Sequence, residues 1–206
     1  MKLTSKPLIL LLGVAAMLLT SAAKEKERPK FTPGPAASYT CRQTSQNVTI
    51  GAAALLSDTQ TAPAFGKLNP NDLGILPVLV VIQNDTNQTL ALENMKVELT
   101  TPDRQHVEAT PPADLRYLHG AGRPGASYPS PVPGAPPRVS RKKNPLASWE
   151  IEGRAFVARM LPPRETASGF FYFRTPFREG STLYLTGLRE AQTGKELFYF
   201  EILLEK

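Results

Sequence analysis

The chain has 206 residues, of which 41% are hydrophobic and 20% charged, a composition typical of one globular domain with accessory segments. Its formal net charge of +6 is concentrated, because residues 115–149 contain six basic side chains and no acidic one. A nucleic-acid-binding domain spreads basic residues over a folded face, so this distribution excludes nucleic acid as the expected partner.

The first 23 residues have the three parts of an export signal. Two lysines precede an apolar run over residues 8–19, and Ser21, Ala22 and Ala23 offer small side chains for cleavage. The run is short for a membrane-spanning helix, and a charged stretch follows at once. We expect a signal peptide over residues 1–23 and an exported protein, periplasmic or extracellular, without a transmembrane segment after cleavage. An uncleaved N-terminal anchor is the alternative.

Residues 24–46 are charged and then rich in proline, alanine and serine, which predicts a flexible spacer before a domain over residues 47–206. The one cysteine, Cys41, falls in this spacer and has no second cysteine to pair with. We expect a spectator thiol, with an intermolecular bridge as the alternative. The domain must then be held together by its core, which its length allows.

The first half of the domain predicts a central strand and a hairpin. Residues 78–82 are all apolar and mostly β-branched, so both faces of that strand are expected to be buried. Apolar and polar side chains alternate over residues 95–100, and residues 106–109 return as the hairpin partner. A first strand over residues 47–54 and a short helical turn, capped by Asp58, are expected before them.

Residues 111–145 are dense in proline and glycine and lack the apolar periodicity of a core, which predicts a long disordered insertion. Its positive charge suggests contact with an unknown protein, an anionic envelope polymer or membrane headgroups. A solvated loop that merely tolerates length is the alternative. The candidate electrostatic contacts are Arg138, Arg141, Lys142 and Lys143.

Trp149, Gly153, Phe156 and Met160 recur at helical spacing, which predicts one short helix after the insertion. A strand over residues 155–160 is the alternative. Three aromatic segments separated by turn residues then predict three strands, over residues 168–174, 182–188 and 196–203. About seven short strands in all indicate an all-β, antiparallel, immunoglobulin-like β-sandwich.

Two segments carry a resemblance to known domains. A Gly-Ile-Leu-Pro-Val sequence at residues 74–78 leads into the central strand, and residues 161–173 end in Gly-Phe-Phe-Tyr-Phe. This pattern resembles bacterial exported immunoglobulin-like domains, from about residue 47 to the end outside the insertion. The resemblance implies the fold and carries over no activity, catalytic residue or cofactor.

Three Asn-x-Thr triplets, at Asn47, Asn84 and Asn87, match the acceptor pattern for N-glycosylation. The last two lie in the turn expected after the central strand. If the resemblance to bacterial domains holds, these two are turn residues.

The C-terminal strands predict an aromatic surface. If Phe171 and Phe173 face the core, the period of two sends the neighbouring aromatic side chains to the outer face. On three adjacent strands such a patch would bind a partner or a glycan, or would be covered by residues 149–160 or part of the spacer. The candidate binding residues are Phe170, Tyr172, Tyr184 and Tyr199.

Catalytic chemistry has little support in the sequence. A Cys41–His106 pair would lack a third group to orient it, and no His, Cys or carboxylate cluster has the spacing of metal ligands. We therefore expect no catalytic residue, metal or cofactor. The leading hypothesis is a non-enzymatic exported interaction module of unknown ligand. An envelope-associated structural protein retained by the cationic loop is the alternative, and a hydrolase is a weaker one.

Overall fold

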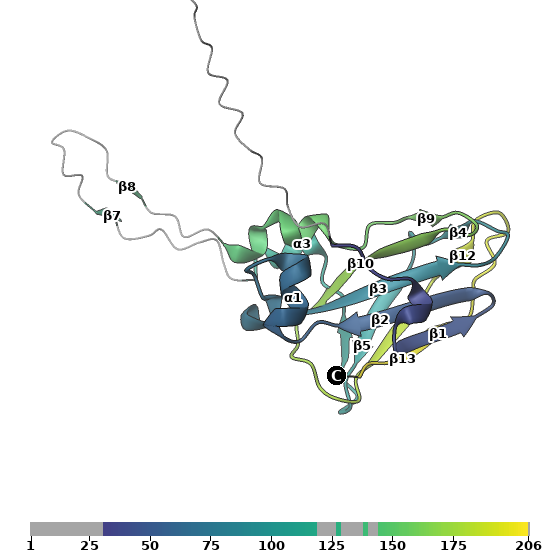
Figure 1. Ribbon diagram of the computed structural model, residues 1–206, viewed down its shortest axis with the longest axis horizontal. Coiled ribbons are helices and arrows are strands. Elements are labelled where there is room, and N and C mark those ends of the chain that lie inside the picture. The colour runs from purple at the N-terminus through teal and green to yellow at the C-terminus, as the bar shows by residue number, and fades with distance from the viewer. Residues whose placement is uncertain (1–30, 119–126, 129–137, 140–143, 206) are drawn as a thin grey trace, which may run out of the picture.

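The computed structural model describes residues 31–118, 127–128, 138–139 and 144–205. These residues form two four-stranded antiparallel sheets that pack face to face (Figure 1). The first sheet contains, in spatial order, β1 (Cys41–Ser45), β2 (Val48–Ala54), β3 (Leu76–Asn84) and β10 (Thr166–Phe173). The second sheet contains β13 (Phe200–Leu203), β11 (Thr182–Thr186), β5 (Lys96–Thr100) and β6 (His106–Glu108).

Smaller elements complete the described part of the chain. A three-stranded sheet at one end of the sandwich consists of β12 (Arg189–Glu190), β4 (Leu90–Ala91) and β9 (Met160–Leu161), and β7 (Ser127–Tyr128) pairs with β8 (Arg138–Val139). The helices are α1 (Asp58–Phe65), α2 (Pro112–Leu115) and α3 (Trp149–Gly153). Three 3₁₀ turns are η1 (Ala36–Ser38), η2 (Pro70–Leu73) and η3 (Pro145–Ala147). None of these helices is long and apolar enough to cross a bilayer.

The prediction of an antiparallel β-sandwich is confirmed at the level of the sandwich. Its core lies between the sheets, where side chains from alternate positions of both meet. Its fully buried or nearly buried side chains include Val78, Val80 and Ile82 of the first sheet and Leu99, Leu183 and Phe200 of the second. The predicted hairpin is also confirmed, because Val97 and Leu99 of β5 are buried and β6 pairs beside it.

The predicted central strand is confirmed as β3, which lies between β2 and β10. Its inner side chains enter the sandwich core, whereas Leu79 and Val81 pack on the outer face against a second apolar cluster. Both faces are therefore buried, as a continuous apolar run requires.

The predicted spacer is wrong at its C-terminal end, because residues 41–45 form β1. Gln46 and Asn47 have φ values of 52° and 59°, so they form a two-residue turn of type I′ that joins β1 to β2. The strand is polar, and its residues are alternately half-buried and exposed, as is common at a sheet edge. A polar composition of this kind is also typical of linkers, which is why the sequence did not indicate a strand. Cys41 of β1 lies opposite Ala52 of β2 in the ladder. Its Sγ accepts a hydrogen bond from the Glu205 N–H at 3.3 Å.

Both ends of the predicted disordered insertion are folded. Leu115 of α2, and Leu146 of η3, which stands one residue beyond the predicted insertion, are completely buried in the outer apolar cluster. The Asn144 side-chain amide donates to the Arg116 carbonyl, which holds the two ends together. The prediction of disorder is therefore wrong at both ends, and residues 119–126, 129–137 and 140–143 lie outside the described residues. The apolar residues at the two ends are too few to show a periodicity in sequence.

The predicted short helix is correct for α3 alone. It ends at Gly153, Ala155 forms an isolated parallel bridge with Phe170 of β10, and β9 begins only at Met160, so the alternative of a strand over residues 155–160 is correct at those two residues alone. The Phe170 N–H donates to the Arg154 carbonyl at 2.9 Å, and the Phe156 N–H donates to the Phe170 carbonyl at 3.1 Å. These bonds satisfy the backbone at the free edge of β10, a demand that side-chain spacing does not reveal.

This close approach depends on Gly169. A Cβ atom at Gly169 would lie 2.4 Å from the Cα and 2.6 Å from the N of Phe156, both backbone atoms that a rotamer change cannot move. We predict that Gly169→Ala lowers the free energy of unfolding by about 1–3 kcal/mol, as overpacking does. Urea denaturation would measure it against Ser168→Ala, an exposed neighbour in β10. Equal stability of the two variants would contradict this account of the edge.

Asn84 ties the end of β3 to two loops. It is completely buried, and its side-chain amide donates to the carbonyls of Gln88, Leu161 and Pro162 at 2.8–3.1 Å. Its Oδ1 accepts hydrogen bonds from the N–H and the hydroxyl of Thr86. A buried amide cannot accept a glycan in the folded chain, so the triplet at Asn84 is a turn motif.

The two asparagines of this turn provide a matched pair for mutation. We predict that Asn84→Ala costs about 1–3 kcal/mol of stability, because the buried Leu161 carbonyl and the part-buried carbonyls of Gln88 and Pro162 lose their donor. Asn87 is exposed, and Asn87→Ala is expected to change stability by only about 0.5 kcal/mol or less. Thermal and urea unfolding of both variants would measure the difference. Similar losses for the two would contradict the role assigned to Asn84.

Candidate functional site

The four candidate aromatic residues do not share one surface. Phe170 and Tyr172 lie on β10 of the first sheet, whereas Tyr184 lies on β11 of the second sheet and Tyr199 immediately precedes β13. The chain crosses from one sheet to the other after β10, so β10 is not adjacent to β11 and β13, which pair with each other. Since each pair points away from the shared core, the two pairs lie on opposite outer faces of the sandwich.

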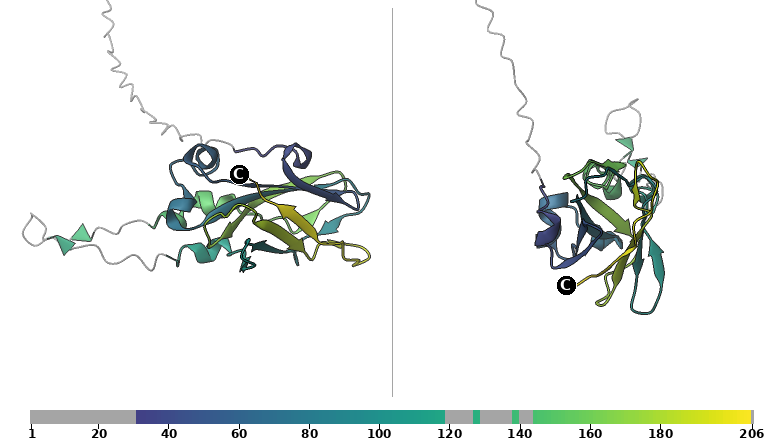
Figure 2. Two further views of the ribbon diagram at one scale, coloured as in Figure 1. Left: turned by 90° about the horizontal axis from the view of Figure 1, so that it is seen from below. Right: turned by 90° about the vertical axis from the view of Figure 1, so that its right-hand side faces the viewer.

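Phe170 and Tyr172 are buried, with 2% and 1% of their surfaces exposed. Short helices cover this face of the first sheet; we call η1, α1, α2, η3 and α3 together the covering layer (Figures 1 and 2). The Phe170 ring lies 4.9 Å from that of Phe65 in α1 and 5.5 Å from that of Phe31, between ring centroids. These two residues therefore cannot contact a partner in the folded chain, which corrects that part of the predicted surface.

The cover has the two sources considered above and others besides. Ile151 and Ala155 belong to residues 149–160, and Phe31 and Ala36 belong to the expected spacer. Helix α1, helix α2 and η3 are the additional sources. A Cβ atom at Gly51 would lie 2.6 Å from the Ala36 carbonyl oxygen, so a glycine in β2 lets the N-terminal segment lie flat on the sheet.

Tyr172 also has a polar role under the covering layer. Its hydroxyl donates a hydrogen bond of 2.7 Å to the Ile151 carbonyl, and burial raises the pKa of that hydroxyl far above the ordinary tyrosine value of about 10. The folded chain thus disfavours the tyrosinate. In the unfolded chain Tyr172 ionises at its ordinary pKa, so this contribution to stability is complete below about pH 10 and is lost above it.

We predict two effects of Tyr172→Phe. Near neutral pH the variant is less stable by about 1 kcal/mol, because the buried Ile151 carbonyl loses its donor. Above about pH 10 its free energy of unfolding falls less steeply than that of the wild type, by up to about 1.4 kcal/mol per pH unit. Urea denaturation at neutral and alkaline pH would measure both. Parallel losses in the two proteins above pH 10 would contradict the assignment.

Tyr184 and Tyr199 remain accessible on the solvent face of the second sheet. Their rings stack with centroids 5.1 Å apart and planes inclined by 20°, and 52% of Tyr199 is exposed. Leu203, on the same face of β13, is also 52% exposed. We call this surface the tyrosine face and define it by Glu98, Tyr184, Tyr199, Glu201 and Leu203.

Strand register places acidic residues beside the tyrosines. Tyr184 stands directly between Glu98 of β5 and Glu201 of β13. Glu108 of β6 is the next residue across from Glu98, and Lys96 is the basic residue on the same face of β5. The pKa of the Tyr184 hydroxyl is raised, chiefly by desolvation. The nearby Tyr199, Glu201 and Glu98 raise it further. The surroundings of the tyrosine pair are therefore net negative.

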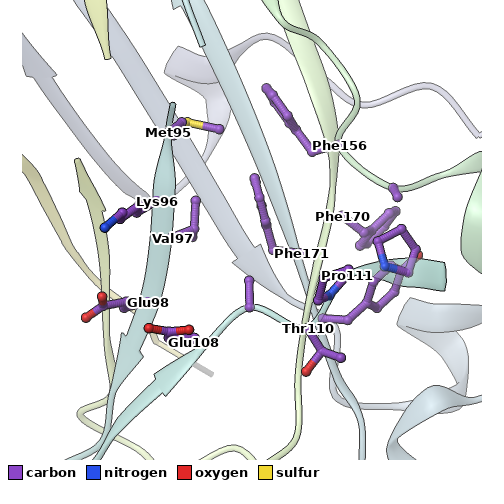
Figure 3. Close-up of a pocket in the computed structure, with 14 residues that line it drawn as sticks. Met95, Lys96, Val97, Glu98, Glu108, Thr110, Pro111, Phe156, Phe170 and Phe171 are labelled. Carbon is purple, nitrogen blue, oxygen red and sulfur yellow. The ribbon is translucent and has the colours of Figure 1, made fainter. Parts of the chain in front are cut away.

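A groove opens at one side of the sandwich between β5 and β10 (Figure 3). Its volume is about 440 Å³, and Val97 and Phe171 point toward each other across it. Phe156 stacks on Phe171 with ring centroids 5.2 Å apart and fills part of the gap between the sheets. Lys96 and Glu98 lie on the other side of β5 from Phe171, and Glu108 and Thr110 add polar side chains to the lining of the groove.

The predicted electrostatic contacts receive no test from the structure. Arg138 is placed in β8, with its backbone opposite Tyr128. Arg141, Lys142 and Lys143 lie outside the described residues.

The Cys41–His106 pair is not formed. Cys41 lies on β1, which neighbours β13: the Glu201 N–H donates to Oε1 of Gln43 at 2.6 Å. His106 lies on β6, at the opposite end of the second sheet from β13. Within the described residues, no group of three or more His, Cys, Asp or Glu could hold a metal ion.

No protein-family model matches the chain, and no curated protein matches it significantly. Among solved structures, the chain is similar to the yjhA protein of Bacillus subtilis, with 8% identity, a TM-score of 0.38, and coverage of 81% of this chain and 98% of that one. It is also similar to an uncharacterised β-sandwich protein of Clostridium difficile, with 10% identity, a TM-score of 0.29, and coverage of 84% and 96%. A third solved structure, a structural-genomics target, is similar with 13% identity, a TM-score of 0.34, and coverage of 79% of this chain and 90% of that one. Scores this low carry no argument about activity.

Proposed function

We propose that this chain is an exported, non-enzymatic binding module that contacts its partner through the tyrosine face. The observation that carries the proposal is the stacked pair of Tyr184 and Tyr199, left accessible on a sheet whose other face is fully packed. Of the two aromatic pairs that point out of the sandwich, this is the one that the covering layer leaves free.

The chemistry of the surface supports binding. Tyrosines combine a large apolar ring with a polar hydroxyl and lose little conformational entropy, which is why they are enriched at the centres of interfaces. Here strand register on both sides of β11 fixes Tyr184, and Tyr199, which directly precedes β13, stacks on it. Leu203 adds exposed apolar surface to the same face.

Two further parts of the proposal, export and the relation to known domains, were first inferred from the sequence. The basic, apolar and small-residue parts of residues 1–23 support secretion. The relation to bacterial immunoglobulin-like domains is proposed at the level of architecture, two antiparallel sheets packed face to face. The strand order supports no closer relation, because β1, β2 and β3 are consecutive neighbours in one sheet, whereas immunoglobulin strands B and C lie in opposite sheets.

A capture experiment tests the binding surface. The tagged mature chain, residues 24–206, is incubated with the envelope fraction of its source. We predict that Tyr184→Thr combined with Tyr199→Thr lowers the capture of partners about tenfold or more, because the substitution removes both rings and keeps a residue favourable in strands. Tyr117→Thr is the matched control, since Tyr117 is an exposed tyrosine outside the tyrosine face.

The same experiment also tests the alternative, in which the cationic loop retains the protein at the envelope. Residues 119–143 are replaced by a short Gly/Ser linker, because Leu115 and Leu146 belong to the covering layer and must stay. If retention depends on this segment and disappears at about 0.5 M salt, while the tyrosine variant behaves as wild type, electrostatic retention replaces our proposal.

A further inference from the structure

The tyrosine face has the chemistry of a surface that recognises basic, proline-rich segments; this inference rests on the function proposed above. Proline-rich segments adopt the polyproline II conformation without internal hydrogen bonds, and they bind to exposed aromatic side chains. Arginine and lysine next to the prolines pair with carboxylates beside the aromatic rings. A site of this kind needs accessible aromatic rings and nearby acids on a rigid support.

The described residues meet both needs. Tyr184 and Tyr199 provide the rings, and strand register places Glu98 and Glu201 on either side of Tyr184. Glu108 extends the acidic side of the face beyond Glu98. The acids here outnumber the single lysine of β5, Lys96, so a cationic ligand is favoured over an anionic one.

The chain itself contains a segment with the complementary composition. Residues 129–137 include five prolines, and within them Pro133 and Pro136 have the Pro-x-x-Pro spacing, followed at once by Pro137 and Arg138. Residues 138–143 add four basic side chains and no acidic one. Residues 129–143 thus match the aromatic and the acidic parts of the tyrosine face together.

The fold favours contact between two copies over contact within one. In sequence, residues 119–143 stand between α2 and η3, and both of these elements are anchored in the covering layer on the first sheet by Leu115 and Leu146. The tyrosine face is on the opposite outer face of the sandwich. In Figures 1 and 2, β7 and β8 lie beyond the end of the sandwich and away from β11 and β13.

We propose that the tyrosine face of one copy binds residues 129–143 of a second copy of this chain. The prolines pack against Tyr199 and Tyr184, and the basic side chains that follow them pair with Glu98 and Glu201. A single contact of this kind is expected to be weak, since it is small and solvent-exposed, and to weaken further as salt rises.

The test uses a fluorescent peptide with the sequence of residues 129–143, titrated with the full mature chain and followed by anisotropy. We expect saturable binding that Tyr184→Thr with Tyr199→Thr weakens about tenfold or more. Glu98→Gln with Glu201→Gln, which keeps the shape of the face, is expected to weaken binding and to flatten its salt dependence. Tyr117→Thr should bind the peptide as wild type does.

Two altered peptides separate the parts of the interaction. Replacing the five prolines by alanine, or the four basic residues by glutamine, is expected to weaken binding about tenfold each. Equal binding of the proline-free peptide would mean charge attraction alone and would overturn the proposal. Binding that neither the tyrosine nor the glutamate variants change would place the peptide elsewhere and overturn it as well.

Sedimentation of the full mature chain gives an independent readout. The wild type is expected to self-associate as its concentration rises, and the tyrosine variant to stay monomeric. If the peptide does not bind and the wild type stays monomeric, the second copy is not the occupant. If capture of an envelope component still depends on the tyrosines in that case, the proposed function is retained. If capture does not depend on them, both the proposed function and the proposed contact between two copies are wrong.

Discussion

The burial of both faces of β3 is the constraint on which the rest of the structure depends. A strand that is apolar on both sides must lie inside a sheet that is itself covered on both sides. The second sheet covers one face, and the covering layer covers the other. The positions of α1, of the N-terminal segment and of both ends of the insertion follow from this demand, because each brings an apolar side chain to the outer face, among them Phe65, Ala36, Leu115 and Leu146.

The second sheet lies under no such demand. Its strands alternate in burial, so one face packs on the core and the other is left to solvent. The tyrosine face therefore lies where the fold leaves an aromatic surface unused for stability. Phe170 and Tyr172 instead pack against the covering layer. The two aromatic pairs differ in role because their strands belong to different sheets.

The sequence predicted local features well and their assembly less well. The apolar run of β3 and the alternation in β5 indicated their burial correctly, because side-chain period depends on the strand alone. The same period predicted that Phe170, Tyr172 and Tyr184 point away from the core, yet it does not say which sheet a strand joins. The cover over Phe170 also escaped prediction in part, since α1 contributes few apolar residues. β1 was missed because a polar edge strand has the composition of a linker.

The edges of the two sheets are closed in different ways. Residues 154–156 and Thr110 bond to the outer edge of β10, and β1 lies beside β13 with the Gln43 side chain on the Glu201 N–H. β6 has only three residues, of which His106 and Glu108 are exposed and polar. Exposed strand edges are the usual templates for aggregation by strand addition. Within the described residues, the edges of the two four-stranded sheets are thus occupied or short, which protects the sandwich from aggregation by strand addition.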